Sequence, residues 1–181
     1  MKIKKIKFIP AICLSIAFAF TSCDSGVKYS IDNPTDQAIK VIIDDKEAVT
    51  IEPNTFKSFE EELEKGKHTM QLENGEKTEI NLEEYSVLLN PTLTNYVKII
   101  QEYGVGIQSS ANDTTVMIGD KKYVGPIKFV SNAPVISLTD VNYDVETDYP
   151  SVVETTSRGT VTKTKIFRFA DFDKFYEAEM N

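Results

Sequence analysis

Residues 67–82 read KHTMQLENGEKTEINL, two short alternating segments on either side of an Asn-Gly pair. Side chains alternate between the two faces of a β-strand, so the apolar residues of each segment share one face. They are His68, Met70 and Leu72 on the first segment and Ile80 and Leu82 on the second. Asn-Gly readily adopts the positive φ angles of a type I′ turn, which suits a β-hairpin. The stretch therefore predicts a hairpin with one buried face.

Similar β-type segments recur along the chain. They are rich in β-branched or alternating apolar residues and are bounded by turn residues: 29–36, 38–43, 48–51, 85–89, 96–103, 115–118, 122–130 and 160–169. Asp44-Asp45-Lys46 and Gly119-Asp120 are turn-like, which predicts two further hairpins. Pro126 predicts that segment 122–130 is bulged or lies at a sheet edge.

The residue period changes at the C-terminus. Phe172, Phe175, Tyr176 and Glu179 fall on helical spacing, which predicts a helix over residues 171–180, with Asp171 placed to cap its first turn. We expect this helix to cover the sheet, and a partner-binding helix is the alternative. The fold class is therefore mainly β with a C-terminal helix.

Three short motifs within residues 29–83 resemble those of bacterial Ig-like and PEGA-like β-sandwich modules. They are IDDKE at 43–47, IEPN at 51–54 and KGKHTM at 65–70, which match the strand, turn, proline-containing loop and Gly-x-His strand start of such modules. Asp45 stands where glycine is more usual. The resemblance implies an Ig-like/PEGA-like N-terminal module that acts as a scaffold or spacer near the cell envelope and carries no catalytic residue.

Residues 1–22 contain the segments of an export signal peptide in their usual order. Four lysines within the first seven residues precede an apolar run over residues 8–20, and this run is too short to span a bilayer, which needs about 20 helical residues. Thr21-Ser22-Cys23 resembles a lipobox, with a phenylalanine before it where an aliphatic residue is usual. The resemblance implies cleavage before Cys23 and lipidation of that residue by a diacylglycerol thioether and an amide-linked acyl chain such as palmitate. Secretion with a free Cys23 and an uncleaved anchor are the alternatives.

Cleavage changes the charge and the cysteine count of the chain. It leaves 159 of the 181 residues and takes the net charge from −8 to −12, because four lysines and no acid are removed. A chain with this negative charge repels nucleic acid and anionic membrane surfaces. We therefore expect no nucleic-acid partner, and we expect the acyl chains alone to attach the protein to the membrane. Cys13 leaves with the signal, and the single cysteine that remains cannot form an internal disulfide.

The mature chain is expected to have three parts. Residues 23–28 are predicted to be a tether, residues 29–83 the Ig-like/PEGA-like β module, and residues 84–181 a β-rich domain with the C-terminal helix. A mature chain of this length is long enough for one sizeable domain or two small ones.

Residues 140–148 alternate acidic or amide side chains with Val, Tyr and Thr. If the segment is extended, its carboxylates share one face, and an oxygen-rich face attracts calcium. The weak calcium candidates are therefore Asp140, Asp144, Glu146 and Asp148. Alternate carboxylates of a strand lie about 7 Å apart, however, and the glycine and terminal glutamate of an EF-hand loop are missing. We expect a solvated strand face and no cofactor, with the calcium site as the alternative.

Candidate catalytic residues are few. His68 is the only histidine, and its place beside Met70 and Leu72 predicts a partly buried packing residue. No Gly-x-Ser-x-Gly segment supplies a serine nucleophile. Glutamates at positions 60–62, 64, 83 and 84 are paired in sequence, but glycosidases need two carboxyl groups about 5 Å apart across a cleft. We expect these glutamates to be solvated and predict no catalytic residue.

Together these features predict a non-enzymatic cell-envelope lipoprotein that acts as an interaction or structural component, with an envelope protein as its partner. A glycan- or peptide-binding module, with calcium as a possible aid, is the second hypothesis, and a carboxylate-based hydrolase is the third. We expect the lipid anchor in the outer membrane, on its periplasmic or surface face. Asp24 after the cysteine is also compatible with inner-membrane retention.

Overall fold

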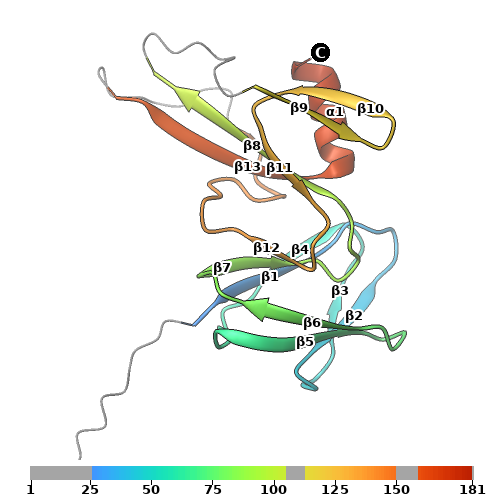
Figure 1. Cartoon of the computed structure of the whole chain (residues 1–181). Helices are drawn as coiled ribbons and strands as arrows, with labels where there is room; N and C mark the ends of the chain where they lie inside the picture. The colour runs from blue at the N-terminus through green and yellow to red at the C-terminus, as the bar shows by residue number, and fades with distance from the viewer. Residues whose placement is uncertain (1–25, 105–112, 150–158, 181) are drawn as a thin grey trace, which may run out of the picture.

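The computed structural model describes residues 26–104, 113–149 and 159–180. Within these residues the chain forms 13 strands in four sheets and one C-terminal helix. This confirms the mainly β fold class and the terminal helix. The two four-stranded sheets lie in the lower part of the view in Figure 1, and the helix lies in the upper part with the remaining sheets. No helix in the described ranges combines the length and apolar character needed to cross a bilayer.

The first four-stranded sheet contains strands from both halves of the chain. Its order is β12 (Val135–Ser137), β7 (Ser86–Leu89), β1 (Lys28–Asn33) and β4 (Thr55–Ser58). β1 lies inside the sheet, parallel to β7 and antiparallel to β4, and all of its residues after Lys28 are buried. Strands from both sides of the predicted boundary at residue 83 therefore share one sheet.

The second four-stranded sheet contains the hairpins predicted for the N-terminal half. Its order is β3 (Val49–Ile51), β2 (Ile39–Ile43), β5 (Gly66–Leu72) and β6 (Lys77–Leu82), and every neighbour pair is antiparallel. The predicted type I′ turn is wrong, because Gly75 has a positive φ of 89° but Asn74 does not. The Gly75 N–H donates to the Leu72 carbonyl, and the Leu72 N–H donates to the Glu76 carbonyl. The loop therefore has three residues, with glycine in the left-handed position.

These two sheets share one hydrophobic core. It includes Ile31 and Leu89 from the first sheet and Val41, Met70 and Leu82 from the second, all almost completely buried. Each such side chain stabilises the fold by about 1.5–3 kcal/mol when it leaves water. The buried face predicted for the hairpin of residues 67–82 is confirmed.

The C-terminal half contains a three-stranded sheet, a hairpin and the helix. The order of the three-stranded sheet is β11 (Ile127–Ser131), β8 (Tyr96–Tyr103) and β13 (Val161–Arg168). The hairpin consists of β9 (Thr114–Ile118) and β10 (Lys121–Gly125), and the helix α1 spans Phe169–Glu179. On one face of the sheet, Ile99 and Phe167 belong to a core with α1 and the hairpin. On the other face, Tyr96 and Ile166 belong to a core with Leu88 of the first sheet. The three-stranded sheet therefore connects the helix to the N-terminal sheets.

The turn predicted at Gly119-Asp120 is confirmed, but the single strand predicted over residues 122–130 is two strands that belong to different sheets. Gly119, with a φ of 61°, begins a two-residue turn between β9 and β10. Pro126 separates β10 from β11, because proline has no N–H to continue the strand ladder. β11 lies at the sheet edge, and its pairing with β8 shifts register between Ile127 and Phe129.

Two predictions near the C-terminus are wrong. The segment 160–169 is predicted to be half-exposed, but residues 164–167 of β13 are all buried, because the chain over 138–149 and α1 pack against them. The helix begins at Phe169, before the predicted start, and Arg168 occupies the N-cap position without a side-chain cap. Asp171 therefore lies in the first turn, where its charge complements the helix dipole, rather than at the cap.

The described fold begins at Gly26, three positions after Cys23 in the sequence. Val27 is fully buried and exchanges two backbone hydrogen bonds with Leu63, of 2.7 and 3.0 Å. A Cβ atom added at Gly26 would lie 2.6 Å from the Glu62 Cβ, so the backbone approaches this neighbour closely. Residues 26–28 of the predicted tether therefore belong to the fold, and β1 begins at Lys28.

Candidate functional site

A cavity of about 990 Å³ lies on the helix-facing side of the three-stranded sheet. Alternate residues of β8 and β13 form one side of it, and α1 and the chain before residue 150 contribute aromatic rings. The residues that matter most are Ile99, Gln101, Lys165, Phe167, Tyr149 and Phe175. Ligand pockets commonly measure about 300–1,000 Å³, so this cavity has room for a sizeable ligand.

Lys165 is the buried charge of the cavity wall. The residue is only 3% exposed, its Nζ donates to the Asp144 carbonyl, and the nitrogen lies 4.7 Å from the centre of the Phe167 ring. Burial lowers the pKa of Lys165 to about 8, and the carboxylates of Asp144, Asp148 and Asp171 only partly oppose this effect. Desolvation disfavours the charged form of an amine, which explains the direction. At neutral pH the fold therefore holds a costly positive charge beside the cavity.

Carboxylates surround the cavity at its more exposed positions. Asp113, Asp148 and Glu179 are exposed lining residues, and Asp171 is half-buried. Asp171 lies 3.6 Å from the Lys174 ammonium. The other three have no ion pair with a described residue. We call Asp113, Asp148, Asp171 and Glu179 the acidic rim.

Tyr149 adds a buried polar group to the cavity wall. Its ring packs edge-on against Tyr143 and Phe175, with centroid distances of 5.6 and 6.3 Å. Its hydroxyl oxygen is buried and has no hydrogen-bond partner of close geometry among the described residues, but the Tyr103 hydroxyl lies near enough to add to burial in raising the pKa of Tyr149. Buried polar atoms are satisfied in the great majority of cases, so this hydroxyl stands out beside a cavity.

Lys98 shows how the same sheet neutralises a buried lysine on its other face. Its Nζ lies 2.8 Å from Oδ1 of Asp140 and donates to the Ser137 carbonyl at 2.5 Å. Lys128 pairs with the second oxygen of Asp140. Burial opposes the charge of Asp140, but the two ammonium groups outweigh it and lower the pKa of Asp140 to about 2. Lys98 therefore has a counter-ion within the fold, whereas Lys165 has none among the described residues.

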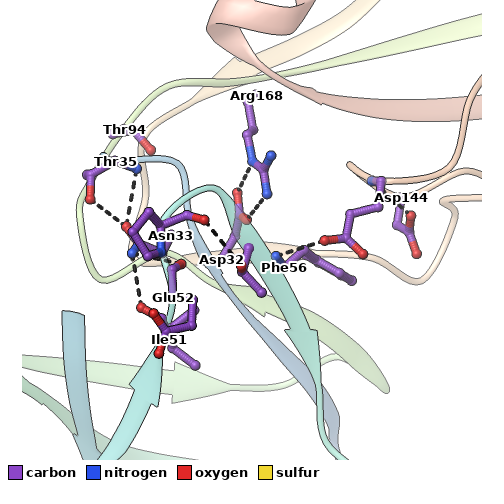
Figure 2. Close-up of polar contacts among 12 residues, drawn as sticks. Asp32, Asn33, Thr35, Ile51, Glu52, Phe56, Thr94, Asp144 and Arg168 are labelled. Atoms are coloured by element: carbon purple, nitrogen blue, oxygen red, sulfur yellow. Dashed lines mark hydrogen bonds and ion pairs between the residues drawn. The ribbon is translucent and has the colours of Figure 1, made fainter. Parts of the chain in front are cut away.

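The structure does not bring the four weak calcium candidates together. Asp140 is occupied by two lysines, and Oδ1 of Asp144 accepts hydrogen bonds from the backbone of Glu146 and of the next residue. Glu146 accepts the Phe56 N–H at 3.1 Å, a contact drawn as a dashed line at Phe56 in Figure 2. Asp148 belongs to the acidic rim.

The carboxylate ridge on which the calcium hypothesis depended does not form. Residues 140–148 adopt turns and bends with one isolated bridge, at Tyr143, so the prediction of an extended strand is wrong. The Asp144 side chain bonds to its own following backbone, which favours a turn over a strand. Among residues 26–104, 113–149 and 159–180, no group of three or more His, Cys, Asp or Glu side chains is placed to hold a metal ion.

A buried ion pair joins the N-terminal sheets to the cavity-bearing sheet. Figure 2 shows Arg168 of β13 reaching Asp32 of β1, with Nε at 2.9 Å and Nη2 at 2.5 Å from the two carboxylate oxygens. The Tyr96 hydroxyl donates to the same carboxylate at 2.6 Å. The hydrogen bond to Asp32 raises the pKa of Arg168. Because these charge-assisted bonds satisfy a fully buried carboxylate, we assign this cluster to structure rather than ligand binding.

His68 is also held by the fold. Its Nδ1 lies 2.5 Å from Oδ2 of Asp44, and its Nε2 lies 2.8 Å from the Glu64 carbonyl oxygen. Burial disfavours the imidazolium, but these two oxygens outweigh it and raise the pKa of His68. Asp44 also accepts the Thr69 N–H at 2.9 Å and has a φ of 51°. The partly buried position predicted for His68 is confirmed. Its ion pair with Asp44 stabilises the turn that follows β2.

Sequence reasoning missed the residues that line the cavity. Lys165 lies in a Thr-Lys-Thr-Lys alternation that is typical of an exposed strand face, and nothing local to it signals burial. The paired glutamates at 60–62, 64, 83 and 84 are exposed, as expected. Cys23 lies outside the described residues.

No family model, curated protein or solved structure matches this chain. Its function is therefore inferred from its own residues and geometry.

Proposed function

We propose that this chain is a non-enzymatic lipoprotein of the cell envelope that works as an interaction component, binding a partner segment in the cavity beside α1. The cavity of about 990 Å³, lined by aromatic, apolar and charged side chains, is the observation that carries this proposal. Binding sites combine an apolar wall with a few polar groups that set orientation, and this cavity has both. The N-terminal sheets, which we infer to be an Ig-like/PEGA-like module, act as the spacer.

The residues before the fold support the lipid anchor. The lysine-rich start, the short apolar run and Thr21-Ser22-Cys23 have the order of a lipoprotein signal. Buried Val27 follows Cys23 by four residues, a span of at most about 14 Å when extended. A lipid on Cys23 would therefore hold the N-terminal sheets close to the membrane, which we take to be the outer membrane.

Two of the deeply buried charges have structural partners. Asp32 and Lys98 are deeply buried, and both are ion-paired within the fold. The cavity wall is formed by a sheet and a helix that share one core, so the cavity is preformed. A preformed cavity in a rigid scaffold lowers the ordering cost of binding.

The anchor is tested by intact-mass analysis and detergent phase partitioning of the protein purified from envelopes. We expect a mass that corresponds to a lipidated Cys23 as the first residue, and partitioning into the detergent phase. The Cys23→Ser variant should move to the aqueous phase and to the soluble fraction. An unmodified thiol at Cys23 in the native product would disprove the anchor.

The interaction is tested by photocrosslinking in intact cells. A photoreactive residue replaces Tyr103 or Gln101, which both line the cavity, or the exposed Tyr85, which does not. We expect the same adduct, identified by mass spectrometry, from the two cavity positions and not from Tyr85. Equal labelling at all three positions, or no adduct from either cavity position, would contradict binding in the cavity.

A further inference from the structure

The cavity contains N–H donors that have no partner among the residues that the structure describes. The Lys165 ammonium has three N–H groups, and within the described ranges only the Asp144 carbonyl accepts one of them. None of the carboxylate oxygens described lies within ion-pair distance of its nitrogen. The buried Tyr149 hydroxyl on the same cavity has the Tyr103 hydroxyl as a neighbour but no hydrogen bond of close geometry with a described residue. Since Lys98 in the same sheet is fully ion-paired, an unpaired lysine is not a general property of this fold.

A single carboxylate is the group that these donors fit best. It can accept hydrogen bonds from an ammonium and from a phenol at the same time, and charge-assisted bonds of this kind are the strong ones. A multiply charged anion such as a phosphate is disfavoured, because three exposed carboxylates of the acidic rim lie around the same cavity. The charge balance therefore selects a monoanion.

The acidic rim calls for a positive group elsewhere on the same ligand. Asp113, Asp148 and Glu179 have no ion pair with a described residue, so a cation at the rim would find complementary charge. Ile99, Phe167 and Phe175 between these regions offer apolar contact. The ligand is therefore expected to carry a carboxylate at its buried end, an apolar portion and a cation nearer the solvent.

We propose that the cavity binds the C-terminal end of a basic peptide, with Lys165 and Tyr149 on the terminal carboxylate and the acidic rim on a lysine or arginine side chain upstream. A cavity of about 990 Å³ has room for several residues rather than one amino acid. This inference rests on the proposed function and names the ligand class of the same site.

Calorimetry on the full-length product, purified in detergent micelles, tests the inference. The probe is the acetylated peptide Lys-Lys-Ala-Phe-Leu, used as the free acid and as the C-terminal amide. We expect the amide to bind roughly tenfold or more weakly, because it loses a hydrogen-bonded ion pair. The Lys165→Met variant should bind both forms equally, and the matched control Lys122→Met, on an exposed lysine outside the cavity, should keep the preference. Replacing the two lysines of the peptide by glutamate should abolish binding.

Each result separates this inference from the proposed function. If acid and amide bind the wild type equally, or if the preference survives Lys165→Met, carboxylate recognition is refuted while binding in the cavity stands. If neither peptide form binds, the peptide inference falls, and the crosslinks from Tyr103 and Gln101 decide the proposed function by themselves. Urea unfolding of each variant confirms that the fold is intact.

Discussion

Lys165→Met is expected to stabilise the protein while removing its proposed ligand contact. Methionine keeps much of the length and apolar character of the lysine stem but carries no charge. Burial lowers the pKa of Lys165 from 10.5 to about 8. At 1.36 kcal/mol for each pKa unit, holding the charged form in the fold costs about 3 kcal/mol at neutral pH. The lost hydrogen bond to Asp144 offsets about 1 kcal/mol, so we expect a net gain of roughly 2 kcal/mol.

The stability difference between Lys165→Met and the wild type should depend on pH. Between about pH 8 and pH 10.5 the unfolded chain holds the Lys165 proton while the folded chain has released it. Unfolding therefore takes up a proton in this window, and the free energy of unfolding of the wild type rises with pH. The variant lacks this contribution, so its advantage at pH 7 should shrink as the pH approaches 10.

Urea unfolding followed by circular dichroism at pH 7, 8.5 and 9.5 measures both quantities. Taking the difference between variant and wild type at each pH cancels the tyrosines and other lysines, which titrate in both proteins. A variant that is less stable than the wild type at pH 7, or an advantage that does not change with pH, would refute the assignment of a buried, unpaired ammonium.

Three further predictions concern contacts within the fold. Asp32→Asn leaves the Arg168 guanidinium without its counter-ion and should lower the free energy of unfolding by about 3–5 kcal/mol in urea; a loss below about 1 kcal/mol would contradict a buried pair. Asparagine at position 44 tolerates the positive φ of that residue, but Asp44→Asn removes the charge beside His68. The pKa of His68, the only histidine of the chain, should therefore fall in an NMR titration. In the wild type, the contribution of His68 to stability is present below its ordinary pKa and is lost as the pH rises through its raised pKa. Gly26→Ala places a Cβ atom against Glu62 and forces the segment that contains Glu62 to shift. The Tm should fall by about 2–4 °C for each kcal/mol of unfolding free energy that is lost. An unchanged Tm would show that the two backbones do not approach this closely.

The parts of the fold that depend on local signals were predictable. Asn74-Gly75 and Gly119-Asp120 mark hairpins because a glycine at each turn accepts a positive φ. The helix at the C-terminus follows from its apolar spacing, although its start is displaced because Arg168 takes the N-cap position. The exact turn type was not predictable, since Asn-Gly is compatible with both a two-residue and a three-residue loop.

The parts that depend on distant partners were not predictable. β1 pairs with β7, and Asp32 meets Arg168 from 136 positions away, and neither contact leaves a local pattern in the sequence. Lys165 belongs to an alternating strand that reads as exposed, but α1 and the chain around Asp144 cover it. The candidate site is therefore a product of tertiary packing.

The placement of β1 constrains when this chain can reach its native state. β1 comes first among the described strands, yet the Arg168 that neutralises its Asp32 carboxylate lies 136 residues later in the chain. Burying that carboxylate before its partner arrives would cost more free energy than an early sheet gains. The sheet that contains β1 is therefore expected to reach its native state only after β13 has been synthesised, so the native pairing of β1 forms late although the strand itself is made early.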